Sequence, residues 1–195
     1  MSFDEPNAII IVKFGYSKHV FMRDLVRQKT SLTEEVEKIL NDQIRQEAKA
    51  SANYLAMASW CDQHGFANSC DFFYRQSGEE REHMLKIFKY INDVGGKAIS
   101  PEVSDIPHNF NSLRSVFEQA LEQEITNTQS INRIVDICYK AKDYTTVNFL
   151  QWFLQEQIEE EFIARRALEL FDVIGEEGVG IYMIDKKIPD IKYEP

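Results

Sequence analysis

Glutamates interrupt four long apolar patterns in this sequence of 195 residues, each near the middle of its pattern. When a core period of about 3.5 residues is applied, Glu47, Glu80, Glu124 and Glu160 fall on the side that should face a core. Because every interruption lies at a midpoint, these glutamates would share one layer whichever way each segment runs. Buried carboxylates repel one another and lose hydration, at a cost of several kcal/mol per ion. A bound cation relieves this cost, so the pattern predicts a metal site.

A histidine accompanies one of these glutamates. His83 follows Glu80 by three residues, which puts both side chains on one face of a helix. Inward glutamates with such a Glu-x-x-His unit are the ligand pattern of di-iron carboxylate bundles. Carboxylates with one imidazole and no thiolate suit Fe(II) or Mn(II), with Zn(II) as a competitor. The alternative is that the charged runs 79–82 and 159–161 are solvated helix faces, but four interrupted patterns favour a metal site.

Four long helices are needed to position these residues. Thr33, followed by acidic residues, is a suitable start for the first helix. The pairs His64–Gly65 and Gly95–Gly96 are breakers after the first and second helices. The predicted helices cover 33–62, 68–93, 112–141 and the stretch from the turn at Asp143 to Gly175, and a short apolar piece follows at 181–188.

The connection between the second and third helices determines the topology. It contains Pro101 and Pro107 and runs over about sixteen residues, which reach at most about 55 Å when extended. Each helix is about 43 Å long at 1.5 Å per residue, so the second and third helices can run parallel. The sequence predicts an all-α four-helix bundle with a long crossover between helices 2 and 3 and a short fifth helix at the C-terminal end.

Composition excludes several classes of function. The chain has 32 acidic and 22 basic residues and a formal net charge of -10, which argues against nucleic-acid binding. No apolar stretch approaches about 18 residues, so no membrane-spanning helix is expected. The three cysteines, Cys61, Cys70 and Cys138, form no CxxC pair, which favours a reducing cytoplasmic location.

The same residues lie in motifs that resemble the non-haem bacterial ferritins from about residue 32 to residue 187. The motifs are LNDQIRQEAKASANYLAMASWC, GEEREHM, FEQALEQEITNTQSIN, NFLQWFLQEQIEEE and GVGIYMIDK. The resemblance implies the ferritin-like fold and an iron-storage ferroxidase without haem. Such a protein oxidises Fe(II) with dioxygen, or with peroxide, and stores Fe(III) as a mineral inside a hollow homo-oligomeric cage of 24 subunits.

Carried over residue by residue, the resemblance implies three iron sites and neighbouring aromatic residues. The first site is Glu47, Glu80 and His83, and Glu80 bridges to a second iron held by Glu124 and Glu160, with Gln157 close to it. The third site consists of Glu79, Glu156, Glu159 and Glu160. Tyr54 is the tyrosine expected beside the catalytic pair. Trp152 lies nearby, and core packing and a redox role are equally plausible for it.

Several alternatives stay open at this stage. Bacterioferritins, rubrerythrins and ribonucleotide reductase small subunits repeat Glu-x-x-His in the second hairpin, whereas residues 156–159 contain no histidine, which favours a ferritin. A non-storing di-metal oxidase, or a structural metal-bound bundle, acting as a monomer or dimer is the rival hypothesis. A ferritin cage that lacks rapid oxidation is a third possibility, which the complete ligand set disfavours.

The N-terminus departs from the family, whose bacterial members begin almost at the first helix. We expect residues 1–31 to be an extension, 32–174 the di-iron bundle and 175–195 a short helix and tail. Met22 is an alternative start, in which case residues 1–21 do not belong to the native protein. Otherwise the run Ala8–Val12 forms part of an extra arm on the shell.

Overall fold

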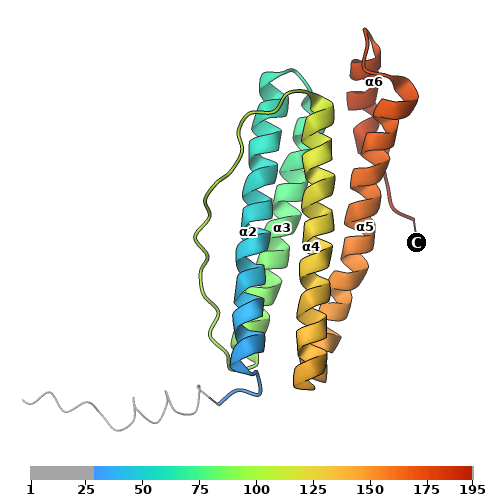
Figure 1. The fold of residues 1–195 in the computed structure, drawn as a ribbon. Coiled ribbons are helices and arrows are strands. Elements are labelled where there is room, and N and C mark those ends of the chain that lie inside the picture. The colour runs from blue at the N-terminus through green and yellow to red at the C-terminus, as the bar shows by residue number, and fades with distance from the viewer. Residues whose placement is uncertain (1–28, 195) are drawn as a thin grey trace, which may run out of the picture.

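The computed structural model describes residues 29–194, and most of them belong to a helical bundle (Figure 1). Residues 1–28 of the predicted extension, with Met22 and the run Ala8–Val12, lie outside the described residues. The described elements are α2 (Glu34–Gln63), α3 (Ala67–Asp93), α4 (Leu113–Ala141), α5 (Tyr144–Ile174), α6 (Gly180–Lys187) and the 3-10 helix η1 (Ile188–Asp190).

Side-chain caps start three of the four long helices. Thr33 accepts a hydrogen bond from the Val36 amide at 3.2 Å, and acidic residues fill the first turn of α2. Ser112 and Ser115 form a reciprocal capping box at α4. Asp143 accepts from the Thr146 amide at 3.0 Å at α5. The predicted start of the first helix at Thr33 is confirmed.

Helix α3 has no side-chain cap of its own, and the C-terminal helix α6 supplies one. The carboxylate of Asp185, only 4% exposed, accepts from the Ser69 amide and hydroxyl, both at 2.8 Å. It also accepts from the Asn68 side-chain amide at 2.6 Å. A negative charge is stabilised at a helix N-terminus, so Asp185 ties the C-terminal end of the chain to the first hairpin.

The long helices form two hairpins joined by one crossover. Helix α2 packs against α3, α4 packs against α5, and α2 also packs against α4. The loop of residues 96–112 runs along the length of the bundle beside α2, so α3 and α4 run parallel, as predicted (Figure 1). Helix α6 packs at one end against α5 and α3. All regular structure in residues 29–194 is helical, which confirms the all-α, ferritin-like arrangement.

The core consists of two apolar clusters. One lies at the end near α6 and includes Met57, Phe73 and Phe117, and the other, at the opposite end, includes Leu40 and Ile87. Buried polar residues occupy the middle of each helix between these clusters. We call the titratable ligand candidates of this region the polar layer, which consists of Glu47, Glu80, His83, Glu124 and Glu160.

The buried side of α5 differs in part from the predicted one. On α5, the core period of about 3.5 residues that selects Glu160 also selects residues 153 and 167, and it places Phe149, Glu156, Ile163 and Leu170 on the inward side. The fully buried positions are instead one residue later, at Leu150, Gln157, Ala164 and Phe171. Phe149, Ile163 and Leu170 flank the clusters and are half-buried. Adjacent apolar residues satisfy either pattern, so packing against the neighbouring helices decides between them.

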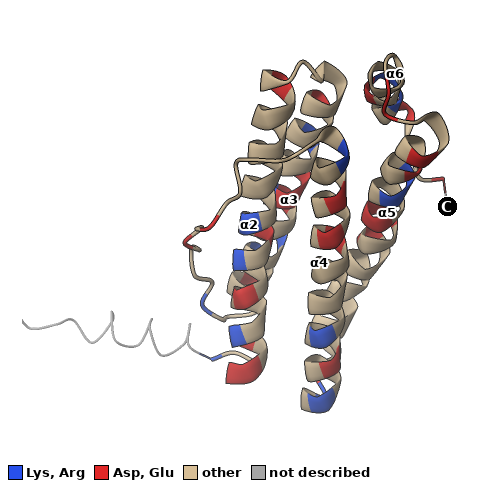
Figure 2. Ribbon diagram, turned by 45° about the horizontal axis from the view of Figure 1, so that its top comes forward, with Lys and Arg blue, Asp and Glu red and all other residues tan. Residues whose placement is uncertain are grey.

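Charged residues are distributed over the whole bundle. Lys and Arg are interspersed with Asp and Glu along the long helices (Figure 2). Within residues 29–194, no helix combines the length and the apolarity needed to cross a membrane.

Candidate metal centre

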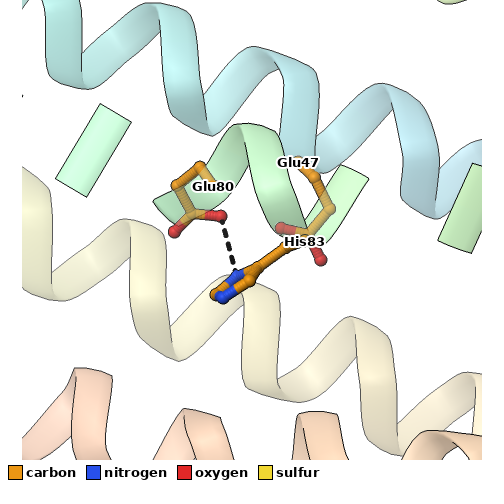
Figure 3. A group of neighbouring side chains, drawn as sticks. All are labelled: Glu47, Glu80 and His83. Carbon is orange, nitrogen blue, oxygen red and sulfur yellow. Dashed lines mark ion pairs between the residues drawn. The ribbon is translucent and has the colours of Figure 1, made fainter. Parts of the chain in front are cut away.

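Three predicted ligands from the first hairpin converge inside the bundle. Glu47 comes from α2, and Glu80 and His83 lie about one turn apart on α3; they are 0%, 2% and 3% exposed. One ligand atom from each lies within 4.8 Å of the others. His83 Nδ1 is 3.5 Å from Glu80 Oε2 (Figure 3). One cation could therefore contact all three side chains.

The second hairpin contributes two further carboxylates at the same level. Glu124 on α4 and Glu160 on α5 are 0% and 5% exposed. The Tyr54 hydroxyl donates a hydrogen bond to Glu124 Oε1. His83, Glu156 and Glu160 form a second group whose ligand atoms lie within 4.8 Å of one another. The imidazole of His83 thus lies within reach of carboxylates from both hairpins.

Three buried atoms of the polar layer have no hydrogen-bond partner among residues 29–194. They are Glu80 Oε2, His83 Nδ1 and Glu160 Oε2. A buried polar atom left unsatisfied costs about 1–3 kcal/mol, and burying several carboxylates adds repulsion. Coordination of a divalent cation would satisfy these atoms, and their oxygen and imidazole chemistry suits Fe(II) or Mn(II). The residues present therefore fit a metal centre.

Burial and mutual repulsion disfavour the charged forms of these carboxylates. Burial, and next the charge of Glu124, raises the pKa of both Glu80 and Glu160 well above its usual range. The pKa of Glu124 is raised to about 7, mainly by burial, although hydrogen bonds from Tyr54 and Gln157 oppose the rise. Burial, followed by the charge of Glu124, also raises the pKa of Tyr54, whose hydroxyl stays protonated as a donor.

A chain of buried amides borders the polar layer and was missed from the sequence. Gln43 Nε2 donates to Glu47 Oε1 at 2.7 Å, and Asn127 Nδ2 donates to Glu47 Oε2 at 3.2 Å. Asn127 Nδ2 also reaches Gln157 Oε1 at 3.3 Å. The available signal was the presence of amide side chains on the core sides of three helices. The amide oxygen of Gln157, predicted to lie near the second iron, here accepts from Asn127.

The remaining predicted ligands lie beside the polar layer around a more open cavity. This outer acidic cavity has a volume of about 350 Å³ and is lined by Glu79, Glu156, Glu159 and Glu160. The C-terminal residues 191–193 border it as well. Glu79 is exposed and accepts a hydrogen bond from Gln76. Burial, and then the charges of Glu156 and Glu79, raises the pKa of Glu159.

Trp152 lies between His83 and the solvent. The residue is 37% exposed, and its ring meets the His83 imidazole edge to face at a centroid distance of 5.2 Å. Lys86 Nζ lies 3.5 Å from the centre of the indole, a cation–π contact. Trp152 therefore packs directly against a ligand candidate, and a redox role for it stays a prediction.

The chain is similar to known proteins over most of its length. Residues 37–174 match the ferritin-like domain family. A bacterial non-heme ferritin from Campylobacter jejuni is 39% identical over 160 residues, which are 82% of this chain and 96% of the relative. A bacterial non-heme ferritin from Staphylococcus saprophyticus is 35% identical over 157 residues, which are 80% of this chain and 94% of the relative.

Solved structures give the same result for the fold. An open pore ferritin from the hyperthermophilic archaeon Archaeoglobus fulgidus superposes with a TM-score of 0.79 and 33% identity, covering 81% of this chain and 96% of that one. An engineered closed form of the Archaeoglobus fulgidus ferritin has a TM-score of 0.79 and 32% identity, covering 84% and 100%. The matched family, the relatives and the bundle agree, and the chain belongs to the ferritin-like family.

Proposed function

We propose that this protein is an iron-storage ferritin whose polar layer is a ferroxidase centre. The observation that carries the proposal is the set of unpartnered buried atoms on Glu80, His83 and Glu160, which face the other carboxylates of the layer. The ferritin names of the relatives support iron as the metal. Two Fe(II) ions are the substrates, together with dioxygen.

Each ligand has a distinct role in this proposal. Glu47, Glu80 and His83 bind the first Fe(II), and Glu80 also reaches the second, which Glu124 and Glu160 bind. Each Fe(II) gives one electron to dioxygen, which with two protons becomes hydrogen peroxide, and both irons become Fe(III). The protein supplies the geometry and the negative charge that stabilise the oxidised pair. Tyr54 holds Glu124 in place through its hydroxyl.

The outer acidic cavity receives iron after oxidation. Glu79, Glu156 and Glu159 form, with Glu160, a third site next to the buried pair. Its carboxylates are more accessible to water than those of the layer, so an ion there exchanges more easily. Passage through this cavity would lead Fe(III) towards a mineral.

Storage requires a hollow assembly, and a homo-oligomeric cage of 24 subunits is part of the proposal. The open pore and closed forms described for the archaeal ferritin support a shell. A cytoplasmic location is also part of it. The three cysteines, which are buried and free, are consistent with a reducing compartment.

One combined experiment tests the function. The full chain is titrated anaerobically with Fe(II), exposed to air and then separated by gel filtration, and iron is counted per subunit in each fraction. We expect rapid oxidation of two Fe(II) per subunit, retention of many more as mineral, and elution near half a megadalton, as expected for 24 chains of 22.8 kDa. Elution as a monomer or dimer that retains only the first irons would favour a non-storing di-metal oxidase instead.

A further inference from the structure

The polar layer has two walls that differ in hydrogen bonding. On the wall formed by α2 and α4, both oxygens of Glu47 and both oxygens of Glu124 accept a hydrogen bond from a protein donor. On the wall formed by α3 and α5, Glu80, His83 and Glu160 each carry a buried atom without a partner. Both oxygens of each carboxylate on the first wall are therefore held by protein donors, whereas each group of the second wall keeps one buried atom that no described protein donor reaches.

Apart from Tyr54, the donors to Glu47 and Glu124 form one continuous chain. The Ser130 hydroxyl donates to Gln43 Oε1 at 2.6 Å, and Gln43 Nε2 donates to Asn127 Oδ1 at 2.6 Å. Asn127 Nδ2 donates to Gln157 Oε1 at 3.3 Å, and Gln157 Nε2 donates to Glu124 Oε2 at 3.4 Å. Branches from Gln43 and Asn127 end on the two oxygens of Glu47. The three amides are 1–2% exposed.

The direction of this chain is determined by its ends. A carboxylate that binds a cation can only accept hydrogen bonds, so the amide groups next to Glu47 and Glu124 must present nitrogen in the metal-bound centre. Within this chain, Asn127 alone contacts both Glu47, on the first hairpin, and Gln157, which donates to Glu124 on the second hairpin. Its carbonyl oxygen accepts a hydrogen bond from Gln43, and its NH2 group donates to Glu47 and Gln157.

We propose that Asn127 is a positioning residue that holds Glu47 and Glu124 in their metal-binding orientations and couples the two halves of the centre. It acts through Glu47 directly and through Gln157 on Glu124. In this arrangement Gln157 supports Glu124 through its NH2 group, and its amide oxygen accepts a hydrogen bond from Asn127. The inference rests on the proposed function only in requiring that the polar layer binds divalent metal.

The physical reason is preorganisation. Hydrogen bonds behind metal ligands fix their orientation, and their loss typically weakens metal affinity about 10–100-fold. Replacing Asn127 by leucine, a side chain of similar size, removes both donors and the acceptor together. Glu47 Oε2 then loses its protein donor, and Gln157 Oε1 becomes free to rotate away from its present position.

The test measures Co(II) binding without oxidation. The full chain and Asn127→Leu are titrated anaerobically with Co(II), followed by visible absorption and calorimetry, after the assembly and helicity of each have been confirmed. We expect two Co(II) per subunit in the parent and about 10–100-fold weaker binding in Asn127→Leu, with both metals affected. Asn132→Leu, at an exposed position of the same helix, is the matched control and should bind as the parent does.

A second variant distinguishes loss of the hydrogen-bond chain from a general packing defect. Gln43→Met removes the other donor to Glu47, and the double variant Gln43→Met with Asn127→Leu completes a cycle. If the amides act as one chain, the double variant binds Co(II) no more than about threefold more weakly than the worse single variant, because coupled residues are non-additive. Fully additive losses, or parental affinity in a folded Asn127→Leu, would overturn the proposal. Failure of the parent itself to bind two Co(II) would instead contradict the proposed function.

Discussion

The polar layer and the outer acidic cavity contain neighbouring residues of the same type in different surroundings. Glu79 and Glu80 are adjacent on α3, and Glu159 and Glu160 on α5, so the members of each pair point about 100° apart. Glu80 and Glu160 are buried with an unpartnered oxygen each, whereas Glu79 is exposed and Glu159 is half-buried. Moving by one residue along either helix therefore changes a buried carboxylate into one that is in contact with solvent.

This difference indicates a division of tasks. The buried carboxylates lose hydration, so a cation that binds there recovers a large electrostatic cost and is held by directed ligands. The carboxylates of the outer acidic cavity keep contact with water, so they bind a cation more weakly and release it more readily. In the proposed function, oxidation takes place in the polar layer and the product iron moves through the outer acidic cavity. Changes in the layer should consequently have much larger effects than changes in the cavity.

The largest effect is expected for Glu80→Ala. In the proposed centre both irons share this carboxylate, so neither site would keep its geometry in the variant. The rate of Fe(II) oxidation, measured by stopped-flow absorbance with iron below saturation, should fall on the order of 10²-fold or more. Glu82→Ala, two residues away on an exposed position of α3, is the control and should oxidise iron at the parental rate. An unchanged rate in Glu80→Ala would contradict the ligand assignment.

His83→Ala should have a smaller effect, because the carboxylates that remain still attract iron. The variant loses the imidazole of the first site and the contact that Trp152 makes with it. We expect oxidation about 10–100-fold slower at low iron, with partial recovery when Fe(II) is raised. Equilibrium binding of Zn(II), which competes for imidazole sites, should weaken in parallel. Oxidation and Zn(II) binding at parental levels would show that His83 is not a ligand.

The apo protein should lose stability as the pH rises. Glu124 has a folded-state pKa of about 7 against an ordinary value of 4.5, and the pKa values of Glu80 and Glu160 are raised too. Between those two values the folded state binds more protons than the unfolded state, so the free energy of unfolding falls as pH increases. The stabilisation is complete below the unfolded pKa and disappears as the pH passes the folded pKa. Melting temperatures at pH 5 and pH 8, with a chelator present, measure it.

Glu124→Gln removes one of these charges and measures its contribution to the loss of apo stability at high pH. The amide keeps an oxygen for the Tyr54 hydroxyl, which donates to Glu124 in the parent. At pH 8 the apo variant should melt about 2–4 °C above the parent, the change produced by about 1 kcal/mol in a chain of this size. At pH 4 the two should coincide, and metal binding should be impaired. An equal or lower melting temperature at pH 8 would contradict an ionised, buried acidic layer.

The sequence predicted the layer well because its signal is strong. Long helices with few breakers leave little choice of topology, and a glutamate in the middle of an apolar stripe is costly unless it binds something. Glu47, Glu80, His83 and Glu160 do converge in the structure, and the charge of buried Glu124 acts on Glu80 and Glu160; their role as iron ligands stays a prediction.

Features that depend on contacts between distant segments could not be predicted. Gln43 and Asn127 resemble ordinary imperfections in a core pattern, and only the packing of α2 against α4 brings them together. The cap that Asp185 provides for α3 joins residues 116 positions apart. The phase of α5 was ambiguous for another reason, because Phe149 and Leu150 are both apolar and only the neighbouring helices select one.

The smallest effect is expected in the outer acidic cavity, for Glu159→Ala. Glu159 points away from the polar layer on α5, and the carboxylates of Glu156 and Glu79 act on its charge. The first rapid oxidation of two Fe(II) per subunit should keep the parental rate within about twofold, since no ligand of the buried pair is lost. The oxygen consumed per iron, or the recovery of rapid oxidation after a first addition, should change, because the product loses a site on its way out. Stopped-flow absorbance together with an oxygen electrode measures both quantities, with Glu82→Ala again as the control. If Glu159→Ala equals the parent in the rate of the first oxidation, the oxygen consumed per iron and the recovery of rapid oxidation, the cavity does not carry product iron. The cavity and the layer would then differ only in how well their carboxylates are solvated.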